Sequence, residues 1–357
     1  VLCRLGEAAG ADQLIDVTRA HLVGAYDIGP ANRQLLERLS DLQSRVRIPT
    51  TLNASSACLR DDAPGDPAER ERARAVVERY VSMGCRPTLT CAPYHLADAP
   101  RLGECIAWAE SNAVVYANSI LGARTNHTVQ YLDLCAALTG RIPCTGLYRD
   151  AARRATVEID ASLLGASRWR RDGGFALLGL WLGRQLAADA VPLLSGLPED
   201  TASEELRTLG AAAASAGGLA LFHALGLTPE APDRSTATGD VSIPRQVLNV
   251  EDLEAEARSF AVIAGTPLDA VCLGTPHYAY AELRRLRDVL GEMSGRLRVP
   301  VYVSTSRATL ERAVTAGLDV QLLERGVTLL TDTCTYYGQV VPPGAQTVMT
   351  DSAKWAW

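Results

Sequence analysis

The sequence lacks the features that mark several large protein classes. Its longest apolar run with few interruptions, residues 175–183, is far shorter than the ~20 residues needed to span a bilayer. The formal net charge is −6 and the arginines are scattered rather than arranged in a stripe. This charge distribution provides no positive surface potential that would attract nucleic acid, and no segment resembles a targeting peptide. We therefore expect neither a nucleic acid nor a membrane as a partner.

The familiar cysteine and nucleotide motifs are also missing. The nine cysteines are an odd number and include no Cys-x-x-Cys pair, so they do not form a disulfide scaffold. Most are expected to be small buried apolar residues in a reducing compartment, which favours the cytoplasm. The sequence contains no G-x-G-x-x-G, no G-x-x-x-x-G-K-[ST] and no H-E-x-x-H. Function therefore has to be read from other patterns.

Short β-rich runs alternate with helical patterns along the 357 residues. This alternation predicts an α/β fold with mostly parallel sheets. The predicted strands cover residues 14–17, 47–51, 88–90, 114–117, 191–194, 219–223, 270–273, 299–304 and 326–331. The predicted helices cover residues 66–83, 201–216, 251–264, 280–293 and 307–316. A charged turn at 148–156 and a Pro-, Ser- and Thr-rich stretch at 227–244 predict three domains, 1–150, 151–240 and 241–357.

Polar clusters follow many of the predicted strands directly. In α/β proteins ligands bind beyond the carboxyl ends of strands. A single cluster of this kind is most often a turn or a helix cap, but seven of them with Arg, Lys, His and Cys favour a shared polar pocket. The clusters are "DVTRAH" (16–21), "TTLNASS" (50–56), "TCAPYH" (90–95), "ANSILGARTN" (117–126), "LGTPH" (273–277) with "VSTSR" (303–307), "TDTC" (331–334) and "TDSAK" (350–354).

The residue types in these clusters indicate a small anionic substrate. Arg124, Arg307 and Lys354 could neutralise a carboxylate or a phosphate, which a guanidinium binds through two parallel hydrogen bonds. His21 and His277 could transfer protons or orient a leaving hydroxyl.

Two of the cysteines differ from the others in their surroundings. Cys91 and Cys334 lie in polar strand-end loops, whereas Cys272 lies within an apolar run. Loop cysteines beside polar partners are the better candidates for metal ligands or reactive thiolates.

The segment 106–126, "IAWAESNAVVYANSILGARTN", resembles the signature of the aconitase X family. Further blocks resemble the family in the same order: "IDVTRAHLVG", "VRIPTTLN", "MGCRPTLTCAPY", "ALTGRIPCTGLY", "GLALFHALGLTPEA", "VCLGTPH", "VYVSTSRA", "TDTC" and "TDSAK". The resemblance covers essentially the whole chain and corresponds to the large, catalytic part of the family.

The resemblance implies an aconitase-like fold, with several three-layer α/β domains around a central cleft. A separate swivelling domain, absent from this chain, would be fused elsewhere or supplied by a small second subunit. Characterised members are dehydratases (hydro-lyases) that act on cis-3-hydroxy-L-proline or on a mevalonate phosphate. They use an iron–sulfur cluster or an iron site, in which the metal acts as a Lewis acid on the leaving hydroxyl.

The resemblance also implies roles for individual residues, with Gly122 allowing a turn without a Cβ clash. The implied substrate-binding residues are Thr51, Asn53, Asn118, Ser119, Arg124, Thr125, Asn126, Ser306 and Arg307. The implied catalytic residues are His21, Cys91, His277 and Lys354, and the implied metal ligands are Cys91 and Cys334.

This sequence departs from the family pattern at two places. Three cysteines hold the cluster in the family, but the middle position is Thr275 here, and a hydroxyl is a poor ligand for iron that prefers sulfur. Residues 127–130 are His-Thr-Val-Gln, where Arg-Glu-Gly-Gly is expected.

The sequence leaves three hypotheses about function. The chain is a dehydratase of a small hydroxy acid. Alternatively, it is a homologue without a cluster, using one metal ion or none for isomerisation, cyclisation or carbon–carbon cleavage. The third is a non-catalytic binding subunit, which the intact charged blocks disfavour.

Overall fold

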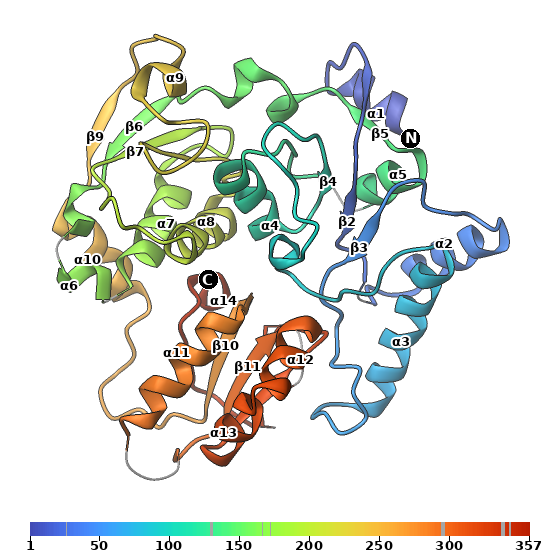
Figure 1. Cartoon of the computed structure of the whole chain (residues 1–357), viewed down its shortest axis with the longest axis vertical. Coiled ribbons are helices and arrows are strands. Elements are labelled where there is room, and N and C mark those ends of the chain that lie inside the picture. The colour runs from blue at the N-terminus through green and yellow to red at the C-terminus, as the bar shows by residue number, and fades with distance from the viewer. Residues whose placement is uncertain are drawn as a thin grey trace. The chain divides into compact units, whose positions relative to one another are not determined.

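Figure 1 shows a computed structural model of the chain, which describes residues 1–25, 27–128, 131–165, 167–171, 173–293, 297–336, 340–342 and 344–357. The chain forms two units. The first contains Val1–Ala20, Ala97–Ala261 and Ala356–Trp357, and the second contains His21–Leu96 and Val262–Trp355. The predicted division into three domains stays a prediction.

A four-stranded parallel sheet lies at the centre of one half of the first unit. Its strands run in the order β8, β7, β6, β9, and hydrophobic residues such as Ile159, Leu178 and Phe222 pack between the sheet and its helices. Parallel neighbours need crossover connections, which helices supply here. The bounds are β6 (Val157–Asp160), α6 (Ser167–Arg171), α7 (Gly174–Gln185), β7 (Pro192–Ser195), α8 (Ser203–Gly217), β8 (His223–Ala224), α9 (Arg234–Thr238), β9 (Arg245–Val247) and α10 (Val250–Ser259).

Small residues allow α7 and α8 to pack closely, and Figure 1 shows the two helices side by side. A Cβ on Gly179 would lie 2.2 Å from the carbonyl oxygen of Leu209, and one on Gly183 would lie 2.7 Å from that of Ala213. Because no side chain separates the two backbones there, this contact requires glycine.

The rest of the first unit contains shorter elements. β1 and β5 pair antiparallel, and α4 continues into a π-helical turn, Ala117–Leu121, that ends at Gly122 with φ +68°. The bounds are α1 (Leu2–Ala8), β1 (Leu14–Asp16), β4 (Ala107–Trp108), α4 (Ser111–Tyr116), α5 (Leu132–Thr139) and β5 (Arg141–Pro143). Short 3₁₀ turns cover Gly146–Tyr148, Asp150–Arg153 and Ser162–Gly165.

The second unit contains the other parallel sheet, in the order β12, β11, β10, β13. Its core includes Leu283, Val303 and Leu322. The bounds are β2 (Ala20–Leu22), α2 (Pro30–Asp41), β3 (Thr50–Leu52), α3 (Pro67–Ser82), a 3₁₀ turn (Pro93–His95), β10 (Ala270–Tyr278), α11 (Tyr280–Gly291), β11 (Val301–Thr305), α12 (Arg307–Thr315), α13 (Leu318–Glu324), β12 (Val327–Leu330), β13 (Val348–Thr350) and α14 (Ala353–Ala356).

The predicted α/β class is confirmed, as are the five predicted helices and most of the strands. The predicted strand at 114–117 is wrong, because these residues belong to α4 and the π-helical turn. The Glu110 side chain caps this helix by accepting from the Asn112 backbone N–H. Residues 111–119 are all buried except Ser111, so the segment shows no polar face, and periodicity alone cannot separate such a helix from a buried strand.

Two further strand predictions need correction. Residues 88–90 form no strand, because Leu89 adopts φ +44° and turns the chain. Residues 219–223 reach β8 only at their last position.

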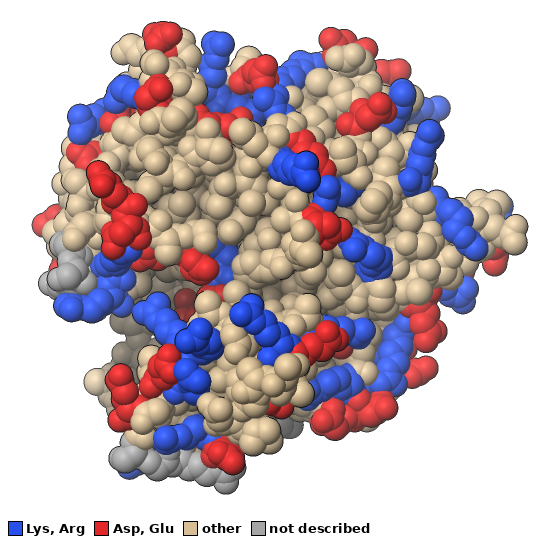
Figure 2. Space-filling view, in the orientation of Figure 1, with Lys and Arg blue, Asp and Glu red and all other residues tan. Residues whose placement is uncertain are grey.

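The distribution of charged residues on the surface and the hydropathy of the helices agree with the expectations from the sequence. Figure 2 shows Lys and Arg interspersed with Asp and Glu on the visible face, without a basic stripe. Within the described residues, no helix combines the length and the apolar character that a bilayer crossing demands.

Candidate functional site

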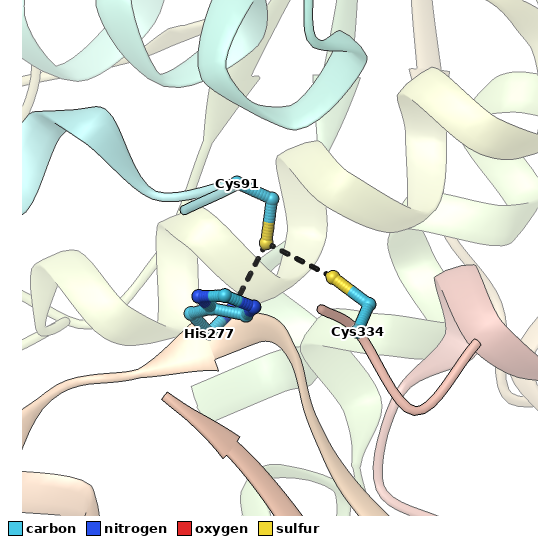
Figure 3. Close-up of side chains that lie close together, drawn as sticks. All are labelled: Cys91, His277 and Cys334. Carbon is cyan, nitrogen blue, oxygen red and sulfur yellow. Dashed lines mark hydrogen bonds between the residues drawn. The ribbon is translucent and has the colours of Figure 1, made fainter. Parts of the chain in front are cut away.

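Two cysteines and one histidine meet in the second unit (Figure 3). Cys91 precedes the 3₁₀ turn Pro93–His95, His277 lies near the end of β10, and Cys334 follows β12. The two Sγ atoms are 3.6 Å apart, and the His277 backbone N–H donates to Cys91 Sγ at 3.2 Å. All three residues are buried, and one potential ligand atom of each lies within 4.8 Å of the others. This group has the dimensions of a metal-binding site.

The hydrogen bonds of the His277 ring define its tautomer. Nε2 lies 3.0 Å from the Thr333 carbonyl oxygen, which can only accept, so Nε2 carries the proton in the neutral ring. Nδ1 then carries the lone pair and accepts from the Thr90 hydroxyl at 3.1 Å. Metal-binding histidines typically donate their second ring N–H to a carbonyl in this way. Both ring nitrogens thus have partners within the protein, and a metal bound through Nδ1 would have to displace the Thr90 hydroxyl.

The middle cysteine position of the family pattern holds a buried threonine, Thr275. The Thr275 hydroxyl lies 3.5 Å from that of Thr335, and its carbonyl oxygen accepts from the Ser352 hydroxyl. Cys272 lies on the same strand, and burial raises the pKa of its thiol to about 11. Cys272 is not one of the residues that meet in the Cys91, His277 and Cys334 group.

The donor set decides which inorganic group fits. Two thiolates and an imidazole suit a single tetrahedral ion with one open position. An iron–sulfur cluster held by three thiolates does not fit, because Thr275 offers only a hydroxyl. The expected three-thiolate cluster is thus inconsistent with the described residues around Cys91 and Cys334.

A second hydrogen-bonded pair lies on β2 and β3. His21 Nδ1 is 2.8 Å from the Thr51 hydroxyl, and both residues are buried. The backbone N–H of Asn53 donates to the Leu22 carbonyl at 2.9 Å, so Asn53 directly follows the paired part of β3. The two strands thus bring three of the predicted site residues together.

An ion pair joins the start of α12 to the loop after β12. Arg307 Nε donates to Asp332 Oδ1 at 2.5 Å, and this bond is the main cause that raises the Arg307 pKa. Ser306 caps α12 by accepting from the Thr309 backbone N–H at 3.1 Å. Lys354 lies half-buried in α14.

The remaining predicted residues lie in the first unit, where their side chains bind backbone. The Asn118 amide donates to the carbonyls of Thr125 and Ala220 at 2.8 and 2.9 Å. Its Oδ1 accepts from Thr125 N and Arg153 Nη1, both at 3.0 Å. All four hydrogen-bonding positions of this amide are therefore occupied. Ser119 Oγ accepts from the Phe222 backbone N–H at 2.9 Å.

The end of the same segment is tied to the 3₁₀ turns that follow β5. Asn126 donates to the Thr145 carbonyl at 2.9 Å and accepts from the Leu147 N–H at 2.7 Å. Arg124 donates to the Tyr148 carbonyl and pairs with Asp150 at 2.5 Å. The buried Thr125 hydroxyl accepts from the Trp108 N–H at 3.2 Å. These bonds give the polar side chains of this run partners within the protein, and their predicted contacts with substrate stay a prediction.

A cavity of about 690 Å³ also lies in the first unit. Its lining is mostly apolar and includes Leu132 and Ile142, with Asn126, His127 and Thr128 among its polar residues. His127 and Thr128, the two described residues of the segment that departs from the family pattern, therefore line this cavity; the other two residues, 129 and 130, lie outside the described part of the chain.

Sequence reasoning missed two buried charged residues. Arg153 is 4% exposed, pairs with Glu230, and donates to the carbonyls of Asn118 and Ala123. The charged turn at 148–156 signalled only a boundary. Asp332 was visible in "TDTC", but nothing in the sequence indicated its pairing with Arg307, 25 positions away.

The structure thus brings the candidates together in two groups. His21, Thr51, Asn53, Cys91, His277, Ser306, Arg307, Cys334 and Lys354 belong to the second unit, and Asn118, Ser119, Arg124, Thr125 and Asn126 belong to the first. The convergence of the two groups on one cleft stays a prediction, as do the individual roles.

The parallel α/β sheets end in polar loops, and the buried Cys–His–Cys group lies in or next to such loops, where α/β proteins bind small ligands. Three family models match consecutive parts of the chain: the aconitase X first domain at residues 1–151, the second at 155–258 and the third at 268–357. The chain therefore belongs to the aconitase X family.

Curated relatives extend this result. The cis-3-hydroxy-L-proline dehydratase of Pseudomonas aeruginosa is 40% identical over 363 residues, covering 100% of this chain and 62% of the relative. The enzyme of the same name from Hypocrea jecorina is 39% identical, covering 100% and 61%. The phosphomevalonate dehydratase large subunit of Thermococcus kodakarensis is 33% identical, covering 96% and 82%. The chain thus spans about three fifths of the two hydroxyproline dehydratases.

A solved structure agrees with the fold. The crystal structure of Thermococcus kodakaraensis aconitase X in its holo-form superposes with a TM-score of 0.88 at 30% identity, covering 99% of this chain and 88% of that chain.

Proposed function

We propose that this chain is the large catalytic part of a dehydratase, a hydro-lyase that removes water from a small hydroxy acid. The observation that carries the proposal is the 40% identity to a cis-3-hydroxy-L-proline dehydratase along the whole chain. This hydroxyproline is the first substrate to test, and phosphomevalonate, named by the archaeal relatives, is the second.

The reaction requires three things of the site: an anchor for the acid group, a base for the adjacent proton, and help for the leaving hydroxyl. Arg307 supplies a cation for the anchor. His21, held by Thr51 at 2.8 Å, is an oriented imidazole that could accept the proton from the carbon next to the carboxylate. Lys354 could protonate the departing hydroxyl so that it leaves as water. The electron pair of the broken C–H bond becomes the new carbon–carbon double bond.

The family also implies an iron group. A single ion held by Cys91, Cys334 and His277 would supply a Lewis acid for the leaving hydroxyl. For that purpose Cys91 and Cys334 would act as thiolates, and the Thr333 carbonyl would fix the His277 ring. No part of the proposal relies on a three-thiolate cluster.

We also propose that the chain works together with a partner subunit or a further domain. Support comes from the archaeal relatives, which are named large subunits, and from the incomplete coverage of the hydroxyproline dehydratases. The partner would be a small swivelling-domain protein.

The experiment is a dehydration assay on protein purified without oxygen, together with any small subunit that co-purifies. Loss of the C3 hydroxyl of cis-3-hydroxy-L-proline is followed by NMR, with phosphomevalonate in parallel. Turnover of either compound supports the proposal, and Cys91→Ser should reduce it ~100-fold or more if the thiol group is part of the centre. Cys3→Ser is the matched control, because Cys3 is an exposed free cysteine. No turnover of either compound by the complete, metal-loaded protein would refute the proposal.

A second candidate function rests on Thr275. Its hydroxyl at the middle ligand position favours a homologue without a cluster that catalyses isomerisation, cyclisation or carbon–carbon cleavage. The fate of the hydroxyl separates the two candidates: its loss favours the dehydratase, and conversion of the substrate without its loss favours the alternative. Iron and acid-labile sulfide contents then identify the inorganic group, because a cluster contains sulfide in amounts that match its iron and a single ion contains none.

A further inference from the structure

The Arg307 guanidinium is held at one position and open at others. Its Nε donates to Asp332 Oδ1 at 2.5 Å, while the side chain as a whole is 46% exposed. Among the described residues, neither terminal nitrogen of Arg307 has a hydrogen-bond or ion-pair partner. A guanidinium bonded only through Nε keeps its two terminal nitrogens available for a carboxylate or a phosphate.

The other member of the pair is buried and immobilised. Asp332 is 1% exposed, and its Oδ2 accepts from the Leu59 backbone N–H at 3.3 Å. Its own carbonyl accepts from the Ser55 N–H at 2.6 Å. Its backbone adopts φ +70°, a conformation that aspartate and asparagine tolerate better than most residues. Hydrogen bonds from Leu59 and Ser55 thus hold Asp332 in place.

The loop that fixes Asp332 also forms the thiol group. Thr333 supplies the carbonyl that accepts from His277 Nε2, and Cys334 faces Cys91. Three consecutive residues therefore orient, in order, a guanidinium, an imidazole and a thiol. A substrate anion bound by Arg307 would be placed relative to the Cys–His–Cys group through this one segment.

We propose that Asp332 is a positioning residue, which orients Arg307 so that its terminal nitrogens bind the carboxylate of an amino-acid-like substrate. This inference rests on the proposed dehydratase function for the identity of the substrate. The anion-binding step itself does not depend on turnover. Asp332 contacts no reacting atom in this scheme and acts only through Arg307.

The experiment is a double-mutant cycle on the complete protein, with L-proline as a carboxylate that carries no hydroxyl to eliminate. Dissociation constants are measured for the wild type, Asp332→Asn, Arg307→Gln and the double variant. Asparagine preserves the tolerated backbone conformation and can still accept a hydrogen bond, but it removes the charge. We expect Asp332→Asn to weaken binding ~10-fold and Arg307→Gln ~30-fold or more. On the Arg307→Gln background, the Asp332 change should have less than a ~2-fold effect.

Arg307→Lys provides a test that does not require a change at Asp332. Lysine keeps the charge but has no planar fork, so we expect it to bind L-proline nearly as weakly as the glutamine variant. Full affinity in the lysine variant would overturn the proposal. An Asp332→Asn effect of equal size in the wild type and in Arg307→Gln would also overturn it. A wild type that binds neither L-proline nor inorganic phosphate, which serves as a second anionic ligand, would overturn it as well.

Turnover distinguishes this inference from the proposed function. If the protein dehydrates its substrate, Asp332→Asn should raise KM ~10-fold and change kcat less than ~3-fold, because the interaction is uniform binding. Turnover with an unchanged KM in Asp332→Asn would leave the dehydratase standing and overturn the positioning role. Binding that depends on both residues, without any turnover, would support the positioning role and refute the dehydratase.

Discussion

Replacing Asn118 with alanine tests whether the Asn118 side chain stabilises the fold or binds substrate. The side chain makes four hydrogen bonds, two to carbonyls, one to a backbone N–H and one to Arg153. At a net ~1 kcal/mol for each bond, the free energy of unfolding of the first unit should fall by ~4 kcal/mol. A change of that size corresponds to a Tm lower by ~8–16 °C for a domain of this size.

Two neighbouring substitutions provide a graded comparison. Ser119→Ala removes one hydrogen bond, from the Phe222 backbone N–H, and should cost ~1 kcal/mol. Asn126→Ala removes two short bonds, at 2.9 and 2.7 Å, and should cost ~2 kcal/mol. Urea denaturation followed by tryptophan fluorescence measures all three. The expected order of destabilisation is therefore Asn118, then Asn126, then Ser119.

A small stability loss combined with weaker substrate binding would refute a structural role for Asn118. If Asn118→Ala lowers the free energy of unfolding by less than ~1 kcal/mol but raises the KM of the substrate, the amide serves the ligand and not the segment. The expectation that Asn118 binds substrate would then be correct, and the four hydrogen bonds would be worth little to the fold.

Three further outcomes are expected. Thr275→Cys should increase the iron and sulfide retained after anaerobic purification, and unchanged contents would show that the missing thiolate does not limit cluster assembly. Gly179→Ala should lower the free energy of unfolding by ~3 kcal/mol, because its Cβ would lie 2.2 Å from a carbonyl oxygen of α8. The control Gly291→Ala should be neutral or stabilising, because the space around Gly291 is open. Equal Tm values for the two variants would contradict the close contact between α7 and α8. Burial raises the Cys272 pKa to about 11, so its thiolate is scarce at pH 8 and becomes abundant only as the pH rises through that value. After alkylation at pH 8, mass spectrometry should find the exposed Cys3 modified and Cys272 unmodified. Rapid labelling of Cys272 in the folded protein would refute its burial.

Local patterns in the sequence determined the α/β class and the positions of the long helices. The predicted helix at 66–83 is α3, in which Asp66 is the N-cap and Pro67 occupies the first turn. The polar strand-end clusters marked the Cys91 and Cys334 loops for the same reason, because such patterns involve only a few adjacent residues. The blocks that resemble the family likewise required no coordinates, and the three family models confirm them.

Only the tertiary structure decided how distant segments use these side chains. His277 obtains its tautomer from Thr90, 187 positions away, and from the Thr333 carbonyl. Asn118 is occupied by Thr125, Ala220 and Arg153. A side chain of a given type can bind backbone, solvent or ligand, and the choice depends on which groups the fold places within about 3 Å of it. Sequence therefore identified the chemical groups of the site, and packing between distant segments assigned their partners.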